Sequence, residues 1–213
     1  MSLGQIRQEI VDYIEGVILP QYKYLPGHTN AHIDKVISRS LAIADEHPEL
    51  NREMVYVIAA YHDRGRLVDD ETHNIESGKM MRKDENLRKF FTDEEIETMA
   101  EAVEDHRASL KGDPRSIYGK VVSSADRNMD IEDMMARSYD YRKHLSPDMP
   151  EDEIIEEARI HIRKKFGPDG YGAKKVYFPT KEHLKCFKQV DELTRDPLAW
   201  RKAVKENNKK RWQ

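Results

Sequence analysis

The sequence predicts an all-α fold, a compact bundle of helices. Apolar residues recur every three or four positions along most of the 213 residues, and this spacing is the period of an α-helix. No run of about four to eight β-branched and aromatic residues alternates cleanly enough to indicate a strand. Residues that commonly start helices precede several of the apolar segments. All three observations favour helices over sheets.

The expected helices can be placed along the chain in order. The first two are predicted from periodicity. The third begins after Asn51 with REMVYVIAAYH, and Gly65 marks its end. A fifth helix starts at Thr92, which forms a capping box with Glu95. A sixth follows Asp113-Pro114 and carries RSIYGKVVSSAD. The helices predicted from periodicity cover residues 6–18, 32–46, 73–82, 150–166, 181–194 and 197–209.

The segment GPDGYGAKKVYFP, residues 167–179, is the one long irregular stretch between helices. Its glycines and prolines are typical of a chain that leaves a helix. We expect a plain connecting loop rather than a cover over a bound nucleotide base. The predicted organisation is a main domain over residues 1–178 and a C-terminal helical extension over residues 179–213.

Composition excludes several classes of protein. The net charge is -4, from 36 basic and 40 acidic residues, so no global attraction to nucleic acid or to a membrane surface is expected. No apolar stretch approaches the roughly 20 residues that span a bilayer. Cys186 is the single cysteine, which precludes an intramolecular disulfide and favours the cytoplasm. An oligomer is neither predicted nor excluded.

Four polar residues continue the apolar faces of four different helices. His62 is spaced by four and seven residues from Ile58 and Val55, so its side chain should face inward. The same spacing predicts inward positions for His32, His106 and Asp126. A single inward histidine is usually a hydrogen-bonded core residue. Three imidazoles and a carboxylate that converge in one core, with no thiolate near, indicate instead a site for a divalent cation.

These residues resemble the motif of the HD-domain superfamily of metal-dependent phosphohydrolases. In that motif a histidine near the start of one helix precedes a His-Asp pair and a distant aspartate. The chain has His32 in GHTNAHIDKV, His62 and Asp63 in AAYHDRGR, and Asp126 in SSADRNMD. Many members insert two further histidines, and His73 and His106 occupy those places. The resemblance covers about residues 27–130 and implies a helical bundle of the HD type.

The resemblance implies hydrolysis of a phosphate ester or anhydride of a small molecule, with nucleotides the favoured class. The nucleophile would be a metal-activated hydroxide. Asp63 would bind the metal and orient the water, together with His32, His62 and Asp126. His106 and His73 would bind a second metal or act as substrate contact and proton donor. One or two ions of Mn, Mg, Ni, Fe or Zn are expected.

Basic residues near the motif are candidates for binding a substrate phosphate. Arg66 replaces a lysine that is frequent in the family and can offer two parallel donors. Arg64 is not part of the family pattern, and we favour a solvated helix end over a substrate contact there. The further candidates are Lys79, Arg127 and His28, and for His28 an exposed loop position is the simpler interpretation.

Two other functions remain open at this point. Some relatives with the six residues His32, His62, Asp63, His73, His106 and Asp126 are di-iron oxygenases. A non-catalytic nucleotide sensor on the same scaffold is the third candidate.

Overall fold

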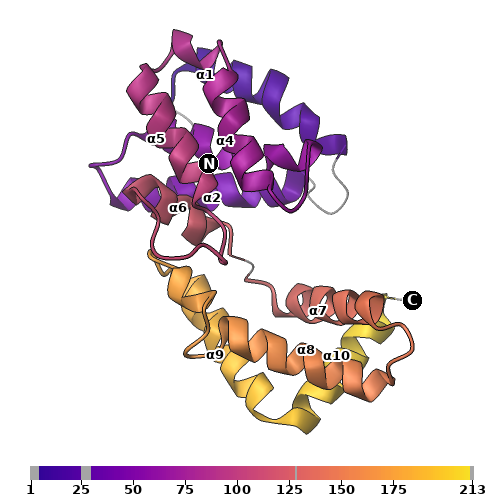
Figure 1. Cartoon of the computed structure of the whole chain (residues 1–213). Coiled ribbons are helices and arrows are strands. Elements are labelled where there is room, and N and C mark those ends of the chain that lie inside the picture. Colours follow the sequence, from indigo (N-terminus) through magenta and orange to yellow (C-terminus); the bar gives the residue numbers. More distant parts are fainter. Residues whose placement is uncertain (1–4, 25–29, 128, 212–213) are drawn as a thin grey trace. The chain divides into compact units, whose positions relative to one another are not determined.

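The computed structural model describes residues 5–24, 30–127 and 129–211, and within them every regular element is a helix. Figure 1 shows the chain as coiled ribbons without a sheet. The all-α prediction is therefore confirmed. Contacts divide the chain into two compact units, Met1–Asp126 and Arg127–Gln213, and each is described by itself.

The first unit is built around helix α3, Arg52–Tyr61, in which every residue from Met54 to Tyr61 is buried. An uninterrupted apolar run is what a helix surrounded by others requires. Its neighbours include α2, Asn30–Glu46, α5, Asp93–Glu104, and α6, Ile117–Ala125. The remaining elements of this unit are α1 (Gln8–Tyr13), η1 (Ile14–Ile18), η2 (Leu19–Tyr24), η3 (Arg64–Leu67), α4 (His73–Lys83) and η4 (Leu87–Lys89).

The capping residues explain where these helices begin. The Asn51 side chain accepts hydrogen bonds from the Glu53 and Met54 amides at the start of α3. Thr92 and Glu95 form the predicted capping box of α5. Helix α6 begins later than Asp113-Pro114 indicates, because Ser116 accepts from the Gly119 amide and thereby caps the helix. The predicted helix over residues 6–18 changes its winding at Ile14, where α1 passes into the π-helical η1.

The second unit consists of α7 (Ile131–Leu145), α8 (Glu151–Phe166), η5 (Ala173–Lys175), α9 (Lys181–Arg195) and α10 (Pro197–Arg211). Its core includes Met135, Phe166, Val190 and the fully buried Trp200. The Trp200 indole donates a hydrogen bond to the Ile155 carbonyl oxygen at 2.9 Å. One apolar core therefore joins α7 and α8 to the two C-terminal helices.

Helix α7 is absent from the sequence-based prediction, although its start carries a signal. The Asp130 carboxylate accepts hydrogen bonds from the Glu132 and Asp133 amides, which is an ordinary N-cap. Because α7 and α8 share their core with α9 and α10, the chain divides after Asp126, whereas the sequence predicts a boundary between residues 178 and 179. The irregular 167–179 segment connects α8 to α9 inside one unit.

No helix in the part of the chain that the structure describes has both the length and the apolar character needed to cross a bilayer.

Candidate metal centre

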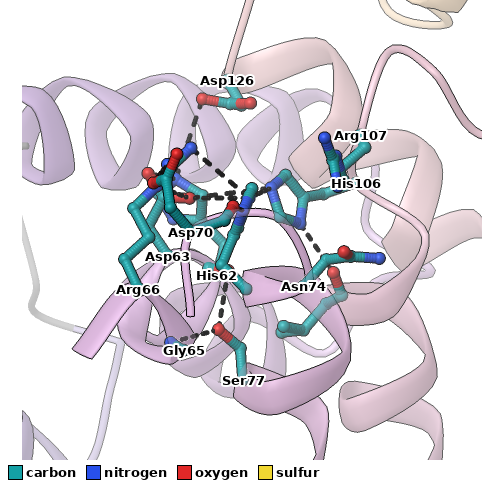
Figure 2. Close-up of polar contacts among 12 residues, drawn as sticks. His62, Asp63, Gly65, Arg66, Asp70, Asn74, Ser77, His106, Arg107 and Asp126 are labelled. Carbon is teal, nitrogen blue, oxygen red and sulfur yellow. Dashed lines mark hydrogen bonds and ion pairs between the residues drawn. The ribbon is translucent and has the colours of Figure 1, made fainter. Parts of the chain in front are cut away.

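The six motif residues come from helix ends in the first unit. His32 lies in the first turns of α2, and His62 and Asp63 directly follow α3. His73 is the first residue of α4, while His106 and Asp126 follow α5 and α6. Four of these side chains are at least 95% buried, namely those of His62, Asp63, His73 and His106. Figure 2 shows the polar contacts around them.

Asp63 lies between two groups of imidazoles and offers one carboxylate oxygen to each. Its Oδ2 is 3.7 Å from His32 Nε2 and 3.5 Å from His62 Nε2. Asp126 completes this first group, because its Oδ1 lies 3.3 Å and 3.7 Å from the same two nitrogens. The two imidazole nitrogens thus lie within 3.7 Å of carboxylate oxygens from both Asp63 and Asp126.

The second group gathers at the other oxygen of Asp63. Asp63 Oδ1 is 3.2 Å from His73 Nε2 and 3.8 Å from His106 Nε2. The two Nε2 atoms are themselves 3.3 Å apart. His32, His62 and Asp63 could hold one metal ion, and Asp63, His73 and His106 could hold another, so Asp63 is the residue that the two sets share.

Backbone carbonyl groups set the protonation of three of the rings. The Nδ1 atoms of His62, His73 and His106 lie 2.8, 2.7 and 2.6 Å from the carbonyl oxygens of Ala59, Asp70 and Val103. A carbonyl oxygen only accepts hydrogen bonds, so each Nδ1 must carry the proton. In the neutral rings the lone pair is then on Nε2, the atom that faces Asp63.

Burial keeps the second group of rings neutral. It lowers the pKa of His106 to about 4, and the nearby His62 acts in the same direction. Burial likewise lowers the pKa of His73. Both rings are therefore available as neutral nitrogen ligands at pH 7.

These features fit a bound divalent cation. With both Nδ1 atoms protonated, the lone pairs of His73 and His106 face each other across 3.3 Å, which is unfavourable unless a positive charge lies between or beside them. His62 Nε2 is buried and makes no hydrogen bond within the described residues. Oxygen and imidazole ligands together suit Mn²⁺, Ni²⁺, Fe²⁺ or Zn²⁺.

Ser77 and Gly65 join η3 to α4 beneath the centre, as Figure 2 shows. The Ser77 hydroxyl accepts a hydrogen bond from the Gly65 amide at 2.7 Å and donates one to the His62 carbonyl oxygen at 3.0 Å. A side chain at Gly65 would meet the His73 carbonyl oxygen at 2.0 Å. The close approach of η3 to α4 therefore holds His62 and Asp63 near His73.

Arg66 is the predicted phosphate-binding residue that the structure brings to the cluster. Its Nε is 3.0 Å from Asp63 Oδ1, and its Nη2 is 3.5 Å from His73 Nε2. Asp70 forms a further ion pair with it. The guanidinium group is thus adjacent to the second group of ligands.

Two of the other predicted substrate contacts, Arg64 and Lys79, pair with residues outside the cluster. Arg64 donates from Nε to Gln21 Oε1 at 2.9 Å, an arrangement that supports neither a substrate contact nor a solvated helix end. Lys79 pairs with Glu76 and is 55% exposed on α4. Arg127 is the first residue of the second unit, and its role stays a prediction. His28 lies outside the described residues.

Sequence reasoning missed the residues that support the ligands. Ser77 is one of them, and the carbonyl groups of Ala59, Asp70 and Val103 are the others. A carbonyl group exists at every residue, so the sequence carries no signal for these partners. Ser77 does lie four residues after His73 and on the same helix face, which is a signal that could have been used.

Comparison with protein families agrees with this geometry. The family model described as HD domain matches residues 30–128, a range that contains all six residues of the cluster. Residues 30–128 form an HD domain. The recognition of this family from the sequence is confirmed, and the match ends close to the division between the two units. Neither curated proteins nor solved structures gave a significant match to the chain.

Proposed function

We propose that the HD domain is a metal-dependent phosphohydrolase acting on a phosphate ester or anhydride of a small molecule, with nucleotides as the favoured class. The observation that carries this proposal is the position of Asp63, whose two oxygens each face a separate group of ligands. A cation bound there would lower the pKa of a water ligand toward neutrality and offset charge on a phosphoryl group.

The residues of the cluster would have different roles in binding metal and substrate. His32, His62, Asp63 and Asp126 would hold the first cation, and Asp63 would orient the attacking water. His73 and His106 would act as ligands of a second cation rather than as proton donors, because their Nδ1 protons are directed to backbone carbonyl groups. Arg66 would bind substrate phosphate oxygens.

The direct test is a screen of phosphorylated metabolites with Mn²⁺, Mg²⁺ or Ni²⁺, in which release of inorganic phosphate is measured. The Asp126→Ala variant is the control, because it removes one carboxylate of the first group. Phosphate release by the wild-type protein alone, without oxygen dependence, would support the hydrolase. Two irons per chain with oxygen consumption would favour the oxygenase. Ligand binding that persists in Asp63→Ala, with no turnover of any compound, would favour the sensor.

Replacing Arg66 with alanine should weaken substrate binding without weakening metal binding. A charge-assisted hydrogen bond contributes about 1.5–3 kcal/mol, so kcat/KM should fall roughly 10- to 100-fold, mostly through KM. Mn²⁺ affinity should stay equal or rise, because Arg66 competes with a cation for Asp63 Oδ1. Steady-state kinetics and calorimetric Mn²⁺ titration measure the two effects. Arg66→Lys should lose less activity.

Lys79→Ala is the matched control for Arg66, because it also removes one positive charge, from the exposed face of α4. Unchanged kinetics are expected for this variant. Equal losses in both variants would indicate a general charge effect and would contradict a specific role for Arg66.

Removing metal with a chelator should lower the melting temperature. A ligand present at a hundred times its Kd stabilises the folded state by about 2.7 kcal/mol, which corresponds to roughly 5–10 °C for a protein of this size. Calorimetry before and after dialysis against EDTA, with metal content measured, tests this expectation. Readdition of Mn²⁺ should restore the higher value. An unchanged melt after verified metal loss would count against the centre.

A further inference from the structure

The N-terminal element η2 contacts the chain immediately beside Asp63. Tyr22 is 1% exposed, and its hydroxyl donates a hydrogen bond to the Ala60 carbonyl oxygen at 2.8 Å. The last four carbonyl groups of an α-helix have no partner inside the helix. Tyr22 therefore holds one of the last carbonyl groups of α3, just before His62.

A second set of contacts holds the residue after Asp63. Arg64 Nε donates to Gln21 Oε1 at 2.9 Å, and its Nη1 lies 3.7 Å from Asp84 Oδ2. The guanidinium group lies over the Tyr61 ring, 5.1 Å from the centroid. Asp84 is held in turn, because the hydroxyl groups of Tyr13 and Tyr61 donate to its Oδ2 at 2.5 and 2.6 Å.

These contacts hold the chain on both sides of Asp63, at the Ala60 carbonyl group before it and at the Arg64 side chain after it. Tyr13, Gln21 and Tyr22 precede the residues 30–128 that match the HD domain, so the support comes from outside the matched region. Asp63 serves both groups of ligands, and a small displacement of its backbone would move both carboxylate oxygens at once. Partners that orient a ligand typically change metal affinity 10- to 100-fold when removed.

We propose that the N-terminal segment is a positioning element of the metal centre, with Tyr22 and Arg64 as its positioning residues. This inference rests on the proposed function. Tyr22 holds the Ala60 carbonyl group near the end of α3, and Gln21 and Asp84 hold Arg64, the residue after Asp63. The unusual arginine of the HDRGR sequence thereby has a role: it anchors the turn and is not directed to substrate.

The test compares Tyr22→Phe with Tyr56→Phe. Both tyrosines are 1% exposed in the first unit, and both changes remove only a hydroxyl group. The Tyr56 hydroxyl makes no hydrogen bond within the described residues, which makes it a matched control. Calorimetric titration with Mn²⁺ should show about a tenfold weaker Kd for Tyr22→Phe and a change of less than about twofold for Tyr56→Phe. Gln21→Leu, at a partly exposed position, should weaken Mn²⁺ binding in the same direction even if Tyr22→Phe folds poorly.

Measuring both the Mn²⁺ Kd and the melting temperature distinguishes a positioning role of Tyr22 from a purely structural one. A merely structural role would lower the melting temperature of the metal-free Tyr22→Phe protein and leave the Mn²⁺ Kd unchanged. Wild-type affinity in both Tyr22→Phe and Gln21→Leu would overturn the positioning role while leaving the metal centre intact. Failure of the wild-type protein to bind Mn²⁺, Ni²⁺, Fe²⁺ or Zn²⁺ would overturn the metal centre itself, and the positioning role with it.

Discussion

Asp63→Asn should abolish phosphate release, with a loss of at least about a thousandfold in kcat/KM. The substitution keeps the volume of the side chain but replaces a carboxylate oxygen with an amide nitrogen that cannot bind a cation. Because each Asp63 oxygen faces one group of imidazoles, one cation position loses its oxygen ligand and the other keeps only a neutral amide oxygen. Metal content per chain, measured after dialysis against Mn²⁺, should fall toward zero.

Two single-group variants provide the comparison for Asp63. Asp126→Asn changes only the group with His32 and His62, and His73→Gln changes only the group with His106. Each should therefore retain more metal than Asp63→Asn. If all three variants bind the same amount of metal, Asp63 is not shared between the groups. Circular dichroism confirms that each variant is folded before metal is counted.

The convergence of the motif residues could be predicted because helical periodicity decides which face of a helix a side chain occupies. His62 and His106 continue stripes of apolar residues, and both are at most 2% exposed. Asp126 follows the same rule less completely, since its side chain is 19% exposed at the end of α6. Periodicity predicts which face of its own helix each side chain occupies. The family resemblance predicts that the four helix ends meet.

The supporting contacts could not be predicted, because they join segments that are distant in sequence. Arg64 reaches Gln21 and Asp84, and no local pattern indicates either partner. The missed helix α7 has a different cause. Its polar residues obscure the apolar stripe, and only the Asp130 cap with basic residues in the last turn marks it.

Gly65→Ala should destabilise the first unit and lower its melting temperature. A Cβ atom at this position would lie 2.0 Å from the His73 carbonyl oxygen and 2.6 Å from the Ser77 amide nitrogen. Both are backbone atoms, so the clash can be relieved only by moving η3 away from α4. Such overpacking costs about 3 kcal/mol, or roughly 10 °C in melting temperature.

Gly16→Ala is the matched control, because a Cβ atom there meets nothing within 4 Å in the helical segment η1. Alanine is favoured over glycine in a helix by up to about 1 kcal/mol, so this variant should melt at the wild-type temperature or above it. The same displacement that destabilises Gly65→Ala would separate Asp63 from His73, now 3.2 Å apart, and weaken Mn²⁺ binding. Equal melting temperatures for the two variants would show that η3 and α4 can separate at little cost. The glycine of HDRGR would then have no part in holding Asp63 beside His73.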